Sequence, residues 1–431
     1  MKQRPLAILA VAVAIGATSA FGQAPAVPPN KSGYSPYPQQ THPNRVFFGD
    51  THVHTSWSWD AGMIGNTLGP EEAYRFARGE TVTSSTGQKV RLARPLDVLV
   101  VADHSDGLGV SAMVAESNEA ILGHALGRQL VEYVKAGKGD AAYDSWRAAT
   151  QKGENPLMND KAIIGSAWHR ITAAAEKFNE PGRFTALIGY EWTSNVQGRN
   201  LHRNVLYRDG KDKADQMVPF TAPGDAVDPE ELWKWMAGYE QKTGGRVFAI
   251  PHNGNLSNGL MFDDVTLTSK RPLDRDYAAR RARWEPLYEV TQMKGTGEAH
   301  PLLSPRDEFA SFELWDRGAL GSGEAKSPDM LPREYAREAL KRGMAYEAKL
   351  GANPFRFGMI GSSDAHTSLA TTQEDNFFGK VVALEPTADP IRFDEIVAGR
   401  IPNPEGRNNR MLARETSASG LAAVWSRDNT R

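Results

Sequence analysis

Short apolar runs alternate with helix-like stretches along the chain from Arg45 onward. The clearest of these runs are VFFG, PLDVLVVAD, RFTALIGYEW, RNVLYR, GRVFAIPHN, EPLYEV and RFGMIGSSDAH. One helix-like stretch begins with the capping pattern Asp228 to Glu231 and ends at Gly244. Near-continuous apolar strands that alternate with helices are typical of a mainly parallel sheet or barrel covered by helices. The sequence therefore predicts an α/β fold.

The first 44 residues have a different pattern. A positively charged start (MKQRP), an apolar core (LAILAVAVAIGA) and a small-residue region (TSAFGQA) are typical of a secretory signal peptide, which we assign to residues 1–23. Residues 24–44 are rich in Pro, Ser and Gln, and we expect an extended leader there. The apolar core is short for a membrane span, so we expect no stable span after cleavage. An uncleaved membrane anchor is the alternative. We expect residues 45–431 to form one domain of a periplasmic or secreted protein, with a helical insertion at about 105–182.

The composition excludes several kinds of chemistry. The 431 residues include no cysteine, which rules out disulfides, a catalytic thiolate and thiolate metal ligands. The formal net charge of −2 shows no basic excess, so we expect no nucleic-acid partner. Any metal site must use imidazole, carboxylate and water ligands, which suit zinc, manganese or iron.

Histidines and carboxylates gather where the apolar runs end. Five of the ten histidines lie at or just after such an end, and a sixth begins the run HRNVLY: His52, His54, His104, His252 and His366, then His202. The accompanying carboxylates are Asp50, Asp60, Asp103, Glu191 and Asp364. Strand ends face the active site in α/β barrels and open sheets, and residues two apart on a strand point to the same side. The pair at 52 and 54, and the same spacing at 364 and 366, therefore predict a metal site.

Several neighbouring residues leave two interpretations open. Asp50 and Asp103 either coordinate a metal or orient an imidazole. Glu289 either lines the same pocket or is a buried carboxylate paired with an arginine, and we expect the pairing with an arginine. The polar residues that flank the histidines are candidate contacts to a small anionic substrate: Arg199, Arg203, Asn204 and Asn253. A guanidinium matches phosphate or carboxylate in a bidentate way, and a salt bridge to a protein carboxylate is the alternative for both arginines.

At these residues the chain resembles the PHP (polymerase and histidinol phosphatase) superfamily of metal-dependent hydrolases, and within it a secreted subgroup catalogued as a domain of unknown function. The resemblance covers about Arg45 to the end of the chain and rests on GDTHVHTSWSWD, LDVLVVADHSDGLG, GYEWTS, LHRNVLY, FAIPHN and GSSDAH. It implies a distorted seven-stranded β/α barrel that holds up to three metals at its strand ends. Similar proteins continue beyond SASGLAAVWSRDNTR, where this chain stops, which implies a C-terminal truncation or a short product.

The resemblance also implies a ligand set. The first metal would be held by His52, His54, Glu191 and Asp364. The second would be held by Asp60, His104 and His366, and the third by His202 and His252 with Glu191 bridging. Asp60 stands where many PHP phosphatases have a histidine, and this harder oxygen ligand leaves the identity of that metal open.

A cluster of divalent metals lowers the pKa of a bound water and stabilises negative charge on the reacting centre. We therefore expect a metal-activated hydroxide that hydrolyses phosphate mono- or diesters, with Asp103, Glu191 and Arg203 as catalytic residues. The first alternative is an amide, lactone or carboxylic ester hydrolase. Amidohydrolase barrels also begin with HxH but usually add a strand-end lysine, and no obvious lysine follows the apolar runs here. The second alternative is a non-catalytic metal-binding protein.

Overall fold

The computed structural model describes a chain with several gaps. The described residues are 43, 45–222, 228–320, 324–371, 373–388, 396–398, 411–412, 415–416 and 419–431. The predicted signal peptide and nearly all of the predicted leader lie outside these ranges. Within them, every helix falls short of the length and apolar character needed to cross a bilayer.

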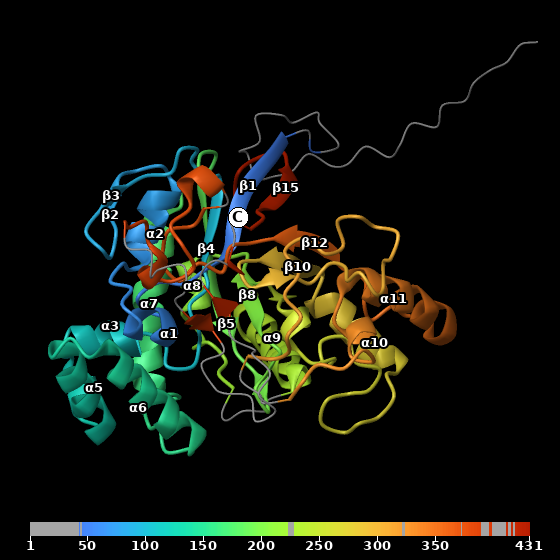
Figure 1. Cartoon of the computed structure of the whole chain (residues 1–431), viewed down its shortest axis with the longest axis horizontal. Coiled ribbons are helices and arrows are strands. Elements are labelled where there is room, and N and C mark those ends of the chain that lie inside the picture. Colours follow the sequence, from blue (N-terminus) through green and yellow to red (C-terminus); the bar gives the residue numbers. More distant parts are fainter. Residues whose placement is uncertain are drawn as a thin grey trace, which may run out of the picture.

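A curled six-stranded sheet lies at the centre of the molecule (Figure 1). In spatial order its strands are β15 (Ala422–Ser426), β1 (Arg45–Val53), β4 (Val98–Val101), β5 (Thr185–Trp192), β8 (Arg203–Tyr207) and β9 (Val247–Pro251). Strands β1, β4 and β5 run parallel, whereas β8 is antiparallel to both of its neighbours and β15 is antiparallel to β1. The sheet is therefore mixed, where the sequence predicted a mainly parallel one.

A second, three-stranded sheet has the order β11 (Gly295–Thr296), β10 (Leu287–Gln292) and β12 (Gly358–Gly361). The segment after β12 reaches the end of β1, where Val53 and Ala365 form a parallel bridge and His54 N donates to Ala365 O at 2.8 Å. This contact is an isolated bridge, because β15 occupies the edge of β1 farther back along the strand. The described residues therefore form a six-stranded half-barrel with a separate small sheet, and the expected closed seven-stranded barrel is not present among them as one ladder.

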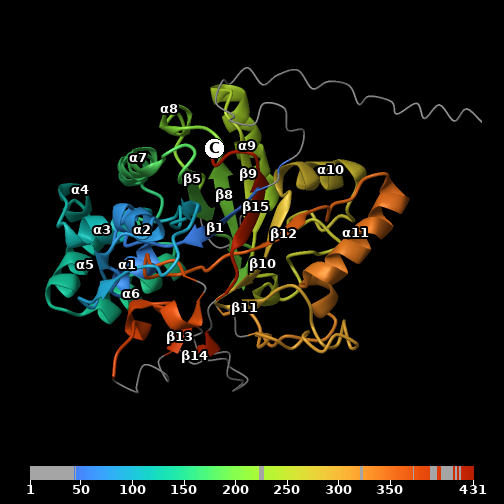
Figure 2. The same cartoon turned by 90° about the horizontal axis from the view of Figure 1, so that it is seen from above.

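Helices lie on both sides of the strands. Five helices connect β4 to β5, in the region where we expected an insertion: α3 (Val110–Ala115), α4 (Glu119–Leu122), α5 (Ala125–Lys135), α6 (Gly139–Gln151) and α7 (Lys161–Phe178). Figures 1 and 2 show α5 and α6 at one end of the molecule, with α10 (Arg275–Trp284) and α11 (Ala336–Leu350) at the other. Helix α9 (Pro229–Thr243) follows Asp228, whose carboxylate accepts from Glu230 N, and ends at Gly244 with φ 65°. Its bounds match the capping pattern in the sequence.

The remaining elements are short. The other helices are α1 (Trp59–Met63), α2 (Pro70–Ala77) and α8 (Lys211–Ala214), with 3-10 turns at Gly254–Leu256, Leu331–Arg333, Glu374–Asn376 and Val382–Leu384. The other strands pair as hairpins: β2 (Val82–Thr83) with β3 (Lys89–Val90), β6 (Asn195–Val196) with β7 (Arg199–Asn200), and β13 (Ile396–Ala398) with β14 (Met411–Leu412).

The largest hydrophobic core packs helix α7 against the sheet. Trp168 and Ile171 of α7 are buried together with Leu99 of β4 and Tyr190 of β5. The indole N–H of Trp168 donates to Ala214 O at 3.1 Å, so this large side chain is buried without an unpaired donor. Each fully buried apolar side chain of this kind contributes about 1.5–3 kcal/mol, and the core thus fixes the strands whose ends carry the histidines.

Candidate metal centre

The predicted histidines converge at one edge of the main sheet. His52 lies in β1 and His54 follows that strand, Glu191 lies near the end of β5, and His252 follows β9 directly. These strands share one direction, so their carboxyl ends meet. The predicted site depended on the meeting of strand carboxyl ends at one edge, and the structure brings these side chains together there.

His202 reaches the same edge because β8 runs antiparallel to β5. Trp192 is opposite Arg203 and Glu191 is opposite Asn204, so the beginning of β8 lies beside the end of β5. This explains why His202 precedes an apolar run while the other histidines follow one. A side chain at the start of an antiparallel strand lies at the same edge as one at the end of a parallel strand.

The first group of donors contains His52, His54 and Asp364, whose donor atoms lie within 4.8 Å of one another, and we include Glu191 because it contacts both imidazoles. The Nε2 atoms of His52 and His54 are 3.1 Å apart. Glu191 Oε2 lies 3.6 and 3.2 Å from these two nitrogens, and Asp364 Oδ1 lies 3.4 and 3.2 Å from them. Zinc bound at about 2.0–2.1 Å by four tetrahedral ligands requires donor atoms about 3.3–3.4 Å apart. Five separations in this group match the edges of such a tetrahedron.

The two oxygens in this group lack hydrogen-bond partners. Glu191 Oε2 and Asp364 Oδ1 are both buried and unpartnered. A buried carboxylate oxygen without a partner is costly, and a divalent cation removes that cost. Burial raises the pKa of both carboxyls, but Lys294 and Lys380 beside Asp364, and three histidines beside Glu191, hold both pKa values well below the usual range. Both groups are therefore ionised, as metal ligands must be, and the residues present fit a bound metal.

A second group surrounds Asp60. Its Oδ2 lies 2.9 Å from His366 Nε2 and 3.2 Å from His104 Nε2. Donor atoms of these three residues and of His54 all lie within 4.8 Å of one another. Burial lowers the pKa of His104, but the carboxylates of Glu191 and Asp60 outweigh burial and raise it to about 10. The residues that the family resemblance implies for a second metal thus lie together with His54 in one group of donor atoms that could hold a metal.

The third predicted group centres on the other oxygen of Glu191. Glu191 Oε1 lies 2.8 Å from His252 Nε2 and 2.7 Å from His202 Nδ1. Donor atoms of His52, Glu191 and His252 lie within 4.8 Å of one another, whereas His202 belongs to none of the compact groups among the described residues. The other ring nitrogen of His202 contacts Asn195 Oδ1 at 2.9 Å. The structure brings His202 to Glu191 without placing it in a complete donor set.

The Nδ1 atoms of the two imidazoles in the first group each contact a polar side chain. His52 Nδ1 lies 3.1 Å from Glu289 Oε2, and His54 Nδ1 lies 3.0 Å from Ser58 Oγ. A partner on the far ring nitrogen fixes the orientation of a metal-binding imidazole and raises its basicity. The expectation that Glu289 pairs with an arginine is wrong, since its partner is His52.

Asp50 and Asp103 support the backbone that carries the ligands. Asp103 accepts from Thr55 N at 2.6 Å and from Thr55 Oγ1 at 2.8 Å, and Asp50 accepts from His52 N at 2.9 Å and Ser363 N at 3.2 Å. Burial raises the pKa of each carboxyl to about 6. These hydrogen bonds differ from both expected roles: Asp50 accepts from main-chain N–H groups, and Asp103 accepts from the main-chain N–H and the hydroxyl of Thr55, where an imidazole or a metal was anticipated.

Three polar side chains that contact Asp364 were not predicted from the sequence. Asp364 Oδ2 lies 2.6 Å from Lys294 Nζ and 2.9 Å from Lys380 Nζ, and it accepts from Gln292 Nε2 at 2.8 Å. Lys294 lies two residues after β10, so the view that no lysine follows an apolar run is corrected. Lys294 lies in the two-residue turn between β10 and β11, where strand alternation gives no signal. Lys380 carried no signal, because it lies in irregular chain.

The expected catalytic and substrate-binding roles of Arg203 need correction. Arg203 lies on the opposite face of β8 from the histidines, and its side chain is 2% exposed. Its Nε donates to Glu285 Oε1 at 3.0 Å and its Nη1 donates to Leu201 O at 2.6 Å. Alternation along the strand turns the guanidinium away from the metal groups, and a buried ion pair occupies it. The salt-bridge alternative is the one that the structure shows.

The other predicted substrate contacts divide into two kinds. Arg199 forms an ion pair with Glu324, with Nε 2.7 Å from Oε2. Asn204 lies on the same face as Glu191, and its Oδ1 is buried and unpartnered. Asn253 follows His252, with left-handed φ of 56° and with both amide atoms buried and unpartnered. The two asparagines thus remain candidate polar contacts beside the metal groups, while Arg199 is engaged elsewhere.

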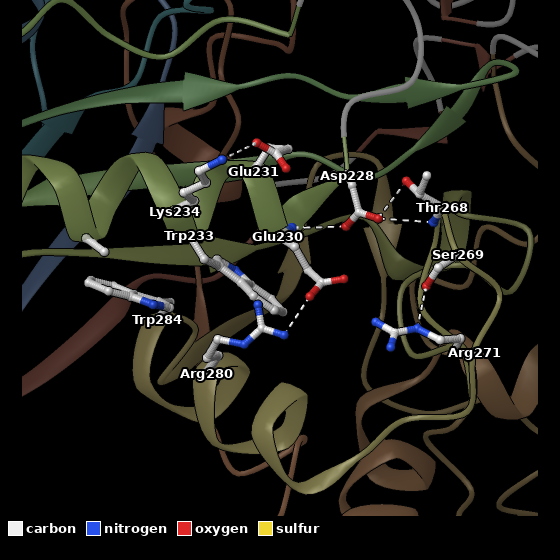
Figure 3. Close-up of a pocket in the computed structure, with 11 residues that line it drawn as sticks. Asp228, Glu230, Glu231, Trp233, Lys234, Thr268, Ser269, Arg271, Arg280 and Trp284 are labelled. Atoms are coloured by element: carbon white, nitrogen blue, oxygen red, sulfur yellow. Dashed lines mark hydrogen bonds and ion pairs between the residues drawn. The ribbon is translucent and has the colours of Figure 1, made fainter.

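A surface cavity of about 720 Å³ lies beside α9 and α10, apart from the histidines (Figure 3). Its charged side chains already contact one another: Arg280 Nη2 lies 2.6 Å from Glu230 Oε1, and Asp228 accepts from Thr268 N and Oγ1. Trp233 lines the cavity but is 1% exposed, and its indole N–H donates to Glu285. This cavity therefore offers few free groups, and the donor groups at the strand ends are the candidate site.

The chain was compared with curated proteins, with solved structures and with protein-family models. No curated protein matches the chain. A solved structure from Bifidobacterium adolescentis ATCC 15703, described as a "putative metal-dependent phosphoesterase", aligns with 74% of this chain and 88% of its own at 12% identity and a TM-score of 0.26. That score is too low to support an argument about the fold or the reaction. The family model DUF3604, "Protein of unknown function", matches residues 41–431, and the chain therefore belongs to the DUF3604 family.

Proposed function

We propose that this protein is a metal-dependent hydrolase that uses a metal-activated hydroxide on phosphate mono- or diesters. One observation carries the proposal: buried carboxylate oxygens without hydrogen-bond partners converge with imidazole nitrogens at the strand ends. When bound, divalent ions there would lower the pKa of a water molecule and stabilise negative charge on the reacting centre.

The protein's own residues have separate tasks in this proposal. Glu191 contributes Oε2 to the first group and Oε1 to His202 and His252, so one carboxylate joins two parts of the cluster. Glu289 and Ser58 orient the imidazoles of His52 and His54. The unpartnered Asn253 Nδ2 can donate to a substrate oxygen, whereas the unpartnered Asn204 Oδ1 can only accept a hydrogen bond.

Bound divalent cations at the site would favour an anionic substrate. Lys294 and Lys380 offset part of the carboxylate charge of the ligands, and Lys294 keeps 12% of its side chain exposed. The carboxylates around the site still outnumber the ammonium groups, so bound divalent cations would supply the positive charge that attracts phosphate esters. We propose a small anionic substrate and a periplasmic or secreted location, in keeping with the N-terminal signal pattern.

Hydrolysis of an amide, lactone or carboxylic ester is the second candidate, and one observation favours it. Lys294 lies at a strand end beside a metal ligand, and a strand-end lysine is the feature that appeared to separate this chain from amidohydrolase barrels. Its ammonium is 2.6 Å from Asp364 Oδ2, which is an ion pair within the protein. For this reason the phosphoesterase remains the leading proposal.

Metal analysis followed by a substrate screen tests the proposal. The protein, purified without chelators, is assayed with p-nitrophenyl phosphate, bis-p-nitrophenyl phosphate and acyl esters in the presence of zinc or manganese. We expect turnover of at least one phosphate ester, with loss of bound metal and of turnover in Glu191→Gln. Glu324→Gln is the matched control, because it alters an exposed carboxylate outside the donor groups. Turnover confined to acyl esters would select the second candidate, and absence of metal from folded protein would reject both.

A further inference from the structure

Asp364 differs from the other ligand carboxylates in how its two oxygens are occupied. Oδ1 is buried without a hydrogen-bond partner and faces the Nε2 atoms of His52 and His54. Oδ2 has three donors within 2.9 Å, namely Lys294 Nζ, Lys380 Nζ and Gln292 Nε2. Charge-assisted hydrogen bonds to ammonium groups are about twice as strong as neutral ones, so Oδ2 is firmly held away from the donor group.

The main chain at Asp364 is held as firmly as its side chain. The residue has a left-handed φ of 57°, an unfavourable conformation for a residue other than glycine. Asp364 N donates to His52 O at 2.8 Å, and Lys380 Nζ donates to the carbonyl oxygen of Asp364 itself. Lys380 therefore contacts both the backbone and the carboxylate of this ligand, and rotation of the carboxylate would break contacts at both places.

We propose that Lys294 and Lys380, which we call the lysine clamp, restrict Asp364 to a single ligand oxygen and so make the first site selective for zinc over manganese. This inference rests on the proposed metal-dependent function and assigns two residues to metal selection. Asp364 offers one oxygen to His52 and His54, and one oxygen of Glu191 contacts the same two imidazoles, so that each imidazole nitrogen lies 3.1–3.6 Å from the other donors. Zinc prefers four donors of this kind, whereas manganese favours additional oxygen ligands.

Charge neutralisation is the competing explanation for the clamp. Two ammonium groups beside a carboxylate also reduce the electrostatic attraction for any cation. That effect would act on zinc and manganese alike, because both carry the same charge. The ratio of the two affinities therefore separates restriction of Asp364 from charge neutralisation.

The test measures zinc and manganese affinities of the full chain by competition calorimetry, with metal content checked by mass spectrometry. In Lys294→Met and Lys380→Met we expect the manganese-to-zinc affinity ratio to rise about tenfold, the scale of changes made around metal ligands. Gln292→Leu removes one donor without changing charge, and we expect a rise of about two- to threefold. Lys294→Arg keeps a donor and should leave the ratio near that of the unaltered protein.

Lys326→Met is the matched control. Lys326 is also buried, with its side chain 6% exposed, and it contacts Glu334 Oε2 at 3.0 Å and Asn255 O at 2.6 Å. It loses the same charge without touching Asp364, so its ratio should stay unchanged. X-ray absorption on manganese-loaded Lys294→Met should show one more oxygen ligand than in the unaltered protein.

Equal shifts of both affinities in the clamp variants, with an unchanged ratio, would overturn the proposal. Should Lys380→Met fail to fold, Lys294→Met and Gln292→Leu still give the ratio. The clamp and the hydrolase can fail separately. Altered ratios without turnover of any ester would reject the hydrolase and retain the clamp, whereas turnover with unchanged ratios would reject the clamp and retain the hydrolase.

Discussion

The two faces of the β5–β8 pair carry buried carboxylates with different surroundings. Glu191 lies on one face, opposite Asn204, and Arg203 lies on the other face, where it contacts Glu285. Glu191 is 1% exposed and Glu285 is 4% exposed, so burial does not distinguish them. What distinguishes them is the chemical nature of the nearest nitrogen atoms.

Glu285 is surrounded by groups that always donate. Its Oε1 accepts from Arg203 Nε and from Trp233 Nε1, each at 3.0 Å, and its Oε2 lies 3.1 Å from Arg281 Nε. Glu191 Oε2 instead lies 3.2 Å from imidazole nitrogens of His54 and His104. An imidazole nitrogen can present a lone pair to a cation, but a guanidinium cannot. The first arrangement stabilises the fold, and the second leaves room for a metal.

Of the substitutions that test this contrast between Glu191 and Glu285, the one at Glu191 is expected to have the largest effect. Glu191→Gln removes the charge of a carboxylate that contacts two parts of the cluster. We expect loss of at least one metal per chain and a fall in turnover on the order of a thousandfold, since metal charge stabilisation supplies several kcal/mol. Metal content by mass spectrometry and kcat on a phosphate ester measure both. A variant with full metal content would remove Glu191 from the ligand set.

The opposite face should respond in stability. Glu285→Ala leaves Arg203 and Arg281 buried without their partner. Breaking a buried ion pair costs about 3–5 kcal/mol, and we expect a loss of that size in the free energy of unfolding by urea titration. Metal bound per folded chain should stay unchanged. Loss of metal with unaltered stability would reverse the roles assigned to the two faces.

A smaller effect is expected behind the first donor group. Glu289→Ala removes the partner of His52 Nδ1. Loss of such an orienting group typically lowers metal affinity about 10–100-fold, and calorimetric titration of the metal-free protein measures it. Glu289→Gln keeps an acceptor and should lose less affinity. Equal affinities in all three proteins would show that the contact to His52 does not orient the imidazole.

The smallest effect is expected at Arg199. Its partner Glu324 has a side chain 38% exposed, and surface ion pairs contribute about 0–1 kcal/mol. Arg199→Ala should leave both the free energy of unfolding and the KM for phosphate esters nearly unchanged. A clear rise in KM would show that Arg199 leaves Glu324 to bind substrate, as the sequence had suggested.

Much of the candidate site follows from local sequence patterns. The HxH spacing at 52 and 54, and the same spacing at 364 and 366, depend only on strand alternation and on where apolar runs end. Those features identified residues that the structure places in two groups that share His54, and the donor atoms within each group lie within 4.8 Å of one another. The α/β class followed in the same way from alternating runs.

What the sequence could not supply depends on contacts between distant segments. Whether Arg203 faces the histidines or Glu285 depends on the register of β8 against β5, and a shift of one residue reverses the face. Lys380 reaches Asp364 from irregular chain sixteen residues away, without any periodic pattern. The antiparallel place of β15 beside β1 joins strands more than 370 residues apart, so the half-barrel could not be anticipated.

The spread of the first donor group along the chain has a consequence for biogenesis. His52 and Asp364 are separated by 312 positions yet lie 3.4 Å apart at their donor atoms. During synthesis, all four donors are available only after the chain has been made as far as Asp364, so a cation cannot bind the complete group earlier. A cation bound to the first donor group would therefore indicate that the whole domain has folded. A supply of cations would stabilise complete chains and would not stabilise nascent ones.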